Sequence, residues 1–170
     1  NKHLKGKKNM PSHTMELPRQ IVVGEKNIDS IGSFLNSLKK TKKISLVSGS
    51  NVKKIVQKKI EASLIASKIK CYWYLAKTND QKTIQDIEKK VRQSKSELVI
   101  GIGGGRSVDI AKLIGFNLNK PFVSIPTSAS HDGIASPFVS VKGDKPHSLV
   151  ATAPLGVFVD VDIIKKAPKR

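Results

Sequence analysis

The stretch Leu98-Val-Ile-Gly-Ile-Gly-Gly-Gly-Arg-Ser-Val-Asp-Ile-Ala-Lys112 decides the fold. Its first residues, Leu98 to Ile102, are apolar and partly β-branched, which is typical of a buried strand. Three glycines follow, and a helical pattern then puts these side chains on one face: Val108, Ala111, Ile114 and Leu118. A tight turn alone would also use such glycines. A strand that turns through glycines into a helix also favours phosphate binding, because the first helical N–H groups are free and the helix dipole is positive there.

A second apolar run, Lys120 to Ile125, predicts another buried strand that Pro126 ends. The loop after it, Pro126-Thr-Ser-Ala-Ser-His-Asp-Gly-Ile-Ala-Ser-Pro137, is rich in small hydroxyl residues and contains one carboxylate, Asp132. Ligands of open parallel sheets bind at the carboxyl ends of strands, near a topological switch point. The two strand ends therefore predict one cleft of nucleotide size.

Outward from this centre, short apolar runs alternate with amphipathic runs. The predicted strands are 20–23, 44–47, 69–75, 98–102, 120–125 and 156–160. Helices are expected over about 27–38, after an N-cap within Ser48-Gly49-Ser50-Asn51, and after a cap at Asn79 or Asp80. The second of these helices is expected to turn five side chains inward: Val52, Ile55, Val56, Ile60 and Leu64.

This alternation predicts an α/β fold, a Rossmann-like, mostly parallel sheet with flanking helices. A β-hairpin is expected near the C-terminus, with strands 138–141 and 148–151 around Lys142-Gly-Asp-Lys-Pro146. We expect residues 1–14 to form a flexible basic tail and residues 15–164 to form a dinucleotide-binding domain. The chain begins with Asn1 and stops within a helical pattern, so we expect a fragment whose residues 165–170 start a further domain.

Composition narrows the class of protein. The single cysteine, Cys71, excludes a disulfide framework and, with no apolar run long enough to cross a bilayer, favours a cytoplasmic protein. The net charge is +18, yet residues 97–164 carry five basic and six acidic side chains, so the predicted site is nearly neutral. The lysines lie elsewhere and lack interleaved aromatic residues, so no nucleic-acid partner is expected.

Gly103-Gly-Gly-Arg-Ser-Val-Asp109 together with Ser130-His-Asp-Gly-Ile-Ala-Ser-Pro137 resembles the archaeal-type sn-glycerol-1-phosphate dehydrogenases. That family is similar to glycerol dehydrogenases, iron-containing alcohol dehydrogenases and dehydroquinate synthases. The glycine pattern is shared across the larger group, whereas the Ser-His-Asp string is typical of the glycerol-1-phosphate dehydrogenases within it. The resemblance runs from Met15 to the last residue and covers the N-terminal half of such enzymes, whose all-helical second domain would be absent here.

The resemblance implies contacts for individual residues. It assigns the following residues to the dinucleotide: Gly103, Gly104, Gly105, Arg106, Ser107, Val108, Asp109, Thr127, Ser128, Ala129, Ser130 and Ser136. It assigns Asp132 to the substrate, dihydroxyacetone phosphate. The family's zinc is held by an Asp and two His that all lie beyond Arg170, so no catalytic or metal-binding residue is expected within the chain.

The implied reaction is NAD(P)H-dependent reduction of dihydroxyacetone phosphate to sn-glycerol 1-phosphate, the backbone of archaeal membrane phospholipids. The chain alone is expected to be the inactive cofactor-binding part. Glycerol dehydrogenase and a non-catalytic nucleotide-binding module stay open as alternatives, as does the oligomeric state, with a homo-oligomer among the candidates. No acid follows the second strand, where Lys53 and Lys54 lie beyond Ser48-Gly49-Ser50-Asn51, so NADP is expected to bind at least as well as NAD.

Overall fold

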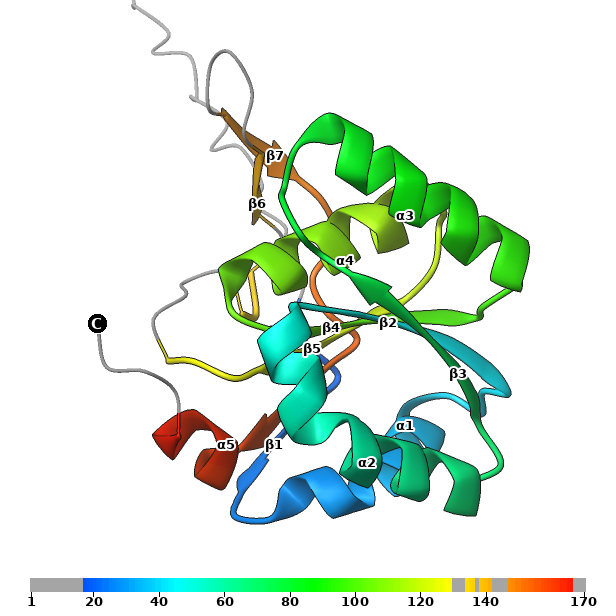
Figure 1. Ribbon diagram of the computed structural model, residues 1–170, viewed down its shortest axis with the longest axis vertical. Coiled ribbons are helices and arrows are strands. Elements are labelled where there is room, and N and C mark those ends of the chain that lie inside the picture. Colours follow the sequence, from blue (N-terminus) through cyan, green and yellow to red (C-terminus); the bar gives the residue numbers. More distant parts are fainter. Residues whose placement is uncertain (1–16, 130–133, 137, 142–146, 167–170) are drawn as a thin grey trace, which may run out of the picture.

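The computed structural model describes residues 17–129, 134–136, 138–141 and 147–166. Its main sheet has six strands that are all parallel, in the order β1-β8-β5-β4-β2-β3. These strands are β1 (Gln20–Gly24), β2 (Lys43–Ser48), β3 (Lys70–Leu75), β4 (Leu98–Gly103), β5 (Phe122–Pro126) and β8 (Gly156–Asp160). The Rossmann-like α/β prediction is confirmed (Figure 1).

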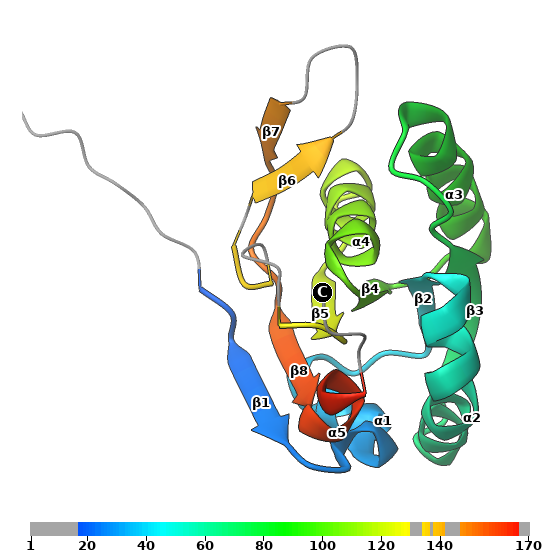
Figure 2. The ribbon, with the colours of Figure 1, turned by 60° about the vertical axis from the view of Figure 1, so that its left-hand side comes forward.

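Helices cover both faces of this sheet. The helices are the 3₁₀ turn η1 (Asn27–Ser30), α1 (Ile31–Leu38), α2 (Ser50–Ala66), α3 (Gln81–Ser94), α4 (Gly105–Asn117) and the short α5 (Val161–Lys165). Side chains of α1 and α2 pack with one buried cluster of strand residues, and those of α3 and α4 with another. The sheet is thus the middle of three layers, as the second view shows (Figure 2).

The predicted hairpin is present as a separate antiparallel pair, β6 (Phe138–Val141) with β7 (His147–Val150). Its second strand begins one residue earlier than expected, and the turn at 142–146 lies outside the described residues. The expected tail at 1–14 also lies outside them. Within the described ranges, no helix has both the length and the apolar character needed to cross a membrane.

Both predicted helix starts are present, but one side chain predicted to face the core is exposed. Asp80 caps α3 as expected, since its carboxylate accepts a 2.8 Å hydrogen bond from the backbone N–H of Thr83. The cap of α2 is Gly49, which lies within the predicted stretch 48–51, and no described side chain accepts a hydrogen bond there. Ile55 was expected inside α2 but is 62% exposed. The stripe of Val56, Ile60 and Leu64 already faces the core, and Ile55 lies beside it.

The edge strand β3 corrects another prediction. Lys53 Nζ lies 5.5 Å from the centre of the Trp73 ring, and Lys70 Nζ lies 5.3 Å from that of Tyr72. The premise that the lysines have no aromatic neighbours is therefore wrong for this edge. The sequence hides the contact because Lys53 and Trp73 meet only when α2 packs beside β3.

The position of α4 depends on Gly101 in β4. A β-carbon on this residue would lie 2.8 Å from the α-carbon of Val108 and 2.9 Å from the carbonyl oxygen of Ser107. Both atoms belong to the backbone of α4, so neither can rotate away. The missing side chain therefore lets α4 lie directly against the strand that precedes it.

We expect Gly101→Ala to lower the free energy of unfolding by about 2 kcal/mol, because the added methyl group has to push α4 away from β4. Urea unfolding followed by circular dichroism measures this change. Gly49→Ser is the control, because a β-carbon at Gly49 meets nothing within 4 Å. A Gly101 variant as stable as the wild-type protein would contradict the packing argument.

Candidate functional site

The start of α4 forms an open cradle of backbone N–H groups. Gly103 ends β4 with φ at +141°, a backbone conformation that side chains rarely permit, and Gly104 is the N-cap of α4. No described side chain caps this helix, and the N–H of Val108 is the one that bonds back to the carbonyl of Gly104, at 3.3 Å. The N–H groups of Gly105, Arg106 and Ser107 precede that first helical bond, so they are available to an anion.

The loop after β5 lies against this cradle. The N–H of Thr127 donates to the carbonyl of Gly103 at 3.0 Å, which ties the two strand ends together. A β-carbon on Gly104 would lie 3.6 Å from the hydroxyl oxygen of Ser128. The structure thus brings the glycines and the start of the Thr127–Ala129 segment to one place at the carboxyl end of the sheet.

Other residues of the predicted cofactor set are in the body of α4. Ser107 and Asp109 are 5% and 6% exposed, and Val108 is fully buried in the core cluster of α3 and α4. Val108 therefore does not present its side chain to the cleft. Ser136 is partly buried, while Ser130 and the predicted substrate residue Asp132 lie outside the described residues.

Lys112 was not singled out by the sequence, yet it is fully buried in α4. Burial lowers the pKa of its ammonium group below the ordinary value of 10.5, and the nearby carboxylate of Asp109 works in the opposite direction. A lysine in a helical pattern is normally assigned to the exposed face. No local signal marks Lys112 as buried, because its burial results from packing on the sheet and on β6.

A hollow of about 280 Å³ lies beside the cradle, at the carboxyl ends of β2 and β3. It is lined by Gly49, Ser50, Asn51, Val52, Leu75, Ala76, Lys77 and Arg106. Arg106 reaches across from α4 and donates from Nη1 to the carbonyl oxygen of Lys77 at 2.9 Å. The chain runs from β2 toward one edge of the sheet and from β4 toward the other, so the topological switch point lies between the ends of β2 and β4. The hollow adjoins this point, because Arg106 of α4 lines it together with the start of α2.

The charged groups of this hollow differ from those expected. Its cationic residues are Lys77 and Arg106, whereas the expected Lys53 and Lys54 do not line it. Lys53 lies over Trp73 instead. The described lining residues include no carboxylate, as the sequence predicted for the end of the second strand.

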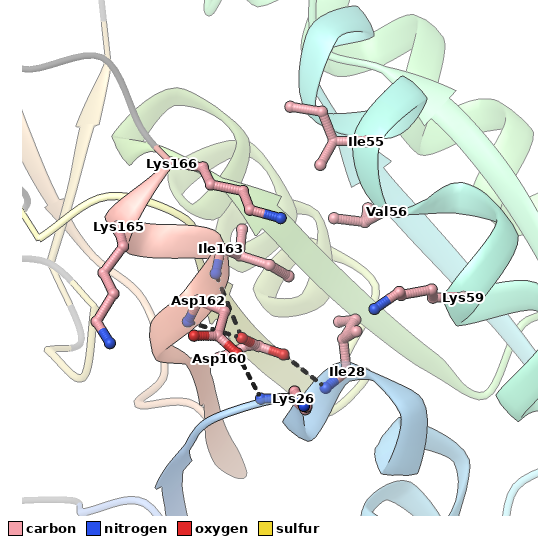
Figure 3. A pocket seen from close by; sticks show the side chains of 10 residues that line it. All are labelled: Lys26, Ile28, Ile55, Val56, Lys59, Asp160, Asp162, Ile163, Lys165 and Lys166. Atoms are coloured by element: carbon pink, nitrogen blue, oxygen red, sulfur yellow. Dashed lines mark hydrogen bonds between the residues drawn. The ribbon is translucent and has the colours of Figure 1, made fainter.

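A larger hollow, about 340 Å³, lies between η1, α2 and α5 (Figure 3). Asp160 at its base is 2% exposed and accepts hydrogen bonds from the N–H groups of Ile28, Asp162 and Ile163, at 2.9, 2.9 and 3.3 Å. These bonds join the end of β8 to η1 and cap α5. The role of Asp160 is therefore structural.

A family model described as iron-containing alcohol dehydrogenase matches residues 22–168. The chain belongs to the iron-containing alcohol dehydrogenase family. The matched region includes the glycine cradle, both loops around it and the adjoining hollow.

Relatives within this family narrow the resemblance. The chain is 64% identical over 166 residues to the glycerol-1-phosphate dehydrogenase [NAD(P)+] of Nitrosopumilus maritimus, covering 98% of this chain and 47% of that protein. It is 58% identical over 165 residues to the protein of the same name from Cenarchaeum symbiosum, covering 97% of this chain and 47% of the relative. The chain thus spans about half the length of these relatives, and the resemblance drawn from its motifs is confirmed.

Solved structures support the fold. Glycerol dehydrogenase from Schizosaccharomyces pombe superposes with a TM-score of 0.85 at 22% identity, over 94% of this chain and 41% of that one. NADH-dependent butanol dehydrogenase A from Thermotoga maritima gives a TM-score of 0.83 at 18% identity, over 94% and 46% of the two chains. At such identities the likeness concerns the iron-containing alcohol dehydrogenase fold alone.

The buried Lys112 gives this family member a testable dependence on pH. Its pKa is lower in the folded state than in the unfolded chain, so between these two values the unfolded chain binds more protons. The free energy of unfolding then rises with pH across that alkaline window. We expect Lys112→Met to flatten the rise, as measured by urea unfolding at a series of pH values up to about 10.5. Lys54→Met, an exposed site on α2, is the control, and an unchanged slope in Lys112→Met would refute the assignment.

Proposed function

We propose that the glycine cradle binds the diphosphate of NADPH or NADH and that the full-length protein reduces dihydroxyacetone phosphate to sn-glycerol 1-phosphate. The observation that carries this proposal is the uncapped start of α4 at Gly104, with the Ser128 hydroxyl 3.6 Å from the position of a Gly104 β-carbon. The shared name of the two archaeal relatives, glycerol-1-phosphate dehydrogenase [NAD(P)+], supports the same reaction. The product would enter the synthesis of membrane phospholipids.

The residues present fit a dinucleotide. The N–H groups of Gly105, Arg106 and Ser107 would donate to diphosphate oxygens, and Ser128 would add a hydroxyl donor from the facing loop. The absence of a side chain at Gly104 lets the anion approach the backbone. When bound, the cofactor supplies the hydride for the carbonyl carbon of the substrate.

Asp109 would support the cofactor site from its buried position in α4. Its carboxylate is buried two residues after Ser107, the last of these three N–H donors, and interacts electrostatically with Lys112, one helical turn further along α4. In this position it would hold the first turn of α4 in shape rather than contact the substrate. We retain Asp132 as the predicted substrate contact on the basis of the resemblance.

The described residues do not offer a metal site, since they contain no group of three or more His, Cys, Asp or Glu side chains that could hold an ion. No step is therefore assigned to a metal within this part of the chain. We propose residues 15–164 as the cofactor-binding domain, and the resemblance assigns the zinc ligands to the part of the relatives that follows.

Gly104→Val tests the cradle without disturbing the fold. A β-carbon at Gly104 meets no atom closer than Ser128 Oγ, so we expect the unfolding midpoint to change little, whereas access of the diphosphate to the N–H groups should be blocked. Loss of one or two charge-assisted hydrogen bonds should weaken NADPH binding about tenfold or more, measured by calorimetric titration. Gly104→Ala should give a smaller loss. Wild-type affinity in the valine variant would exclude the cradle as the binding site.

Lys77 tests the choice between the two cofactors. The hollow that it lines with Arg106 is the proposed site of the adenosine ribose, where a 2′-phosphate would meet two cations. Lys77→Ala should weaken NADPH binding about three- to tenfold while leaving NADH binding nearly unchanged. Lys54→Ala removes an exposed cation outside the hollow and serves as the control. Equal loss for both cofactors would mean that the 2′-phosphate binds elsewhere.

The substrate is tested with the full-length protein by following NADPH oxidation. Dihydroxyacetone phosphate should be reduced, and dihydroxyacetone without the phosphate should be a much poorer substrate. Preference for the unphosphorylated ketone would favour a glycerol dehydrogenase. NADPH binding without turnover of either ketone would favour a non-catalytic nucleotide-binding module.

A further inference from the structure

The outer edge strand β3 carries a concentration of aromatic side chains. Both tyrosines and the single tryptophan of the chain are consecutive here, as Tyr72, Trp73 and Tyr74. Successive side chains of a strand point to opposite faces, so the two tyrosines share one face and Trp73 lies on the other. Both tyrosine rings are partly exposed.

A broad hollow of about 540 Å³ lies over the tyrosine face, between β3 and the end of α3. Its lining residues are Lys43, Tyr72, Tyr74, Lys90, Gln93, Ser94 and Lys95. The exposed Lys70 adds a further cation, with its Nζ 5.3 Å from the centre of the Tyr72 ring. The residues described around this hollow include three lysines and no carboxylate.

This basic tyrosine face is separate from the cofactor site. Lys43 begins β2 and Lys95 follows α3, so the hollow opens toward the amino ends of the strands. The glycine cradle is at the carboxyl ends of the strands. A ligand at this face would leave the cradle accessible.

The chemistry of the face selects among anionic partners. Lysines alone attract any polyanion, and the net charge of +18 strengthens that attraction without giving selectivity. Tyr72 and Tyr74 are two residues apart, which places their α-carbons about 6.5–7 Å apart along the strand with both side chains on one face. Partly exposed rings beside lysines suit a flexible polyanion that carries flat bases, because each base can stack while its phosphate meets a cation.

We propose that the face formed by Lys43, Tyr72, Tyr74, Lys90 and Lys95 binds single-stranded RNA. Unpaired bases pack against the two tyrosine rings, and the phosphates lie at the lysines. A duplex hides its base faces and would gain only the phosphate contacts. An acidic peptide would gain the same charge contacts and make no use of the tyrosines as stacking surfaces.

The test is fluorescence anisotropy of a labelled U12 RNA with the full chain, over a range of salt concentrations. Tyr72→Leu/Tyr74→Leu should weaken binding at least about tenfold, and Tyr72→Phe/Tyr74→Phe should retain it, because phenylalanine keeps the stacking ring. Lys43→Gln/Lys90→Gln should weaken binding and reduce its dependence on salt. Lys54→Gln/Lys58→Gln removes the same charge from exposed positions on α2 and is the matched control. Circular dichroism of each variant establishes that it is folded.

The proposal is supported if U12 binds more tightly than a 12-base-pair RNA duplex or a polyglutamate peptide and if the leucine variant loses this preference. It is overturned if the leucine variant binds like the wild type, or if the two lysine pairs have equal effects, since diffuse charge would then explain the binding. Equal affinity for polyglutamate would also overturn it and indicate an acidic protein partner. NADPH titration of the same variants keeps this result distinct from the proposed dehydrogenase function.

Discussion

The structure depends on the close contact between β4 and α4, which the missing side chain of Gly101 permits. The backbone of α4 occupies the space in which a β-carbon at Gly101 would lie. This contact fixes the direction in which α4 leaves the sheet. It also fixes the position of the glycines that join the two elements, because Gly103 and Gly104 have only to close the short gap between strand and helix.

Most of α4 is buried, whereas its first turn is open to a ligand. Residues from Ser107 to Gly115 are buried between the sheet, α3 and β6, so the helix is held along most of its length. Its first N–H groups face the carboxyl edge, beside the loop that Thr127 ties to Gly103. A rigid helix with an open first turn presents fixed N–H donors, and such donors need little reorganisation to bind an anion.

Those parts of the fold that follow from local sequence patterns can be predicted from the sequence. The six strands, the glycine turn and the Asp80 cap follow from hydrophobic periodicity and from turn residues, and each is present. Features that depend on packing between distant segments are not predictable in this way. Ile55 is exposed because it lines the open hollow between α2 and α5. Lys112 is buried because α4 is enclosed from both sides.

The residues of the candidate site also fall into those that local motifs predict and those that only packing brings together. The glycines and Ser128 are recognisable from their motifs, whereas Lys77 joins Arg106 only because the end of β3 lies beside the start of α4. The stacking of Lys53 on Trp73 also requires the packed structure, and it removes from the cofactor site a lysine that proximity in sequence had assigned to it. Motifs therefore locate the backbone of the site and Arg106, and the fold adds Lys77.

Hydrogen exchange of the first amides of α4 tests the central claim most directly. In the free protein the N–H groups of Gly105, Arg106 and Ser107 precede the first helical hydrogen bond and should exchange quickly. Saturating NADPH should slow their exchange markedly and leave the amides of β3 unchanged. Binding of NADPH that protects other segments and leaves these three amides in fast exchange would contradict the account.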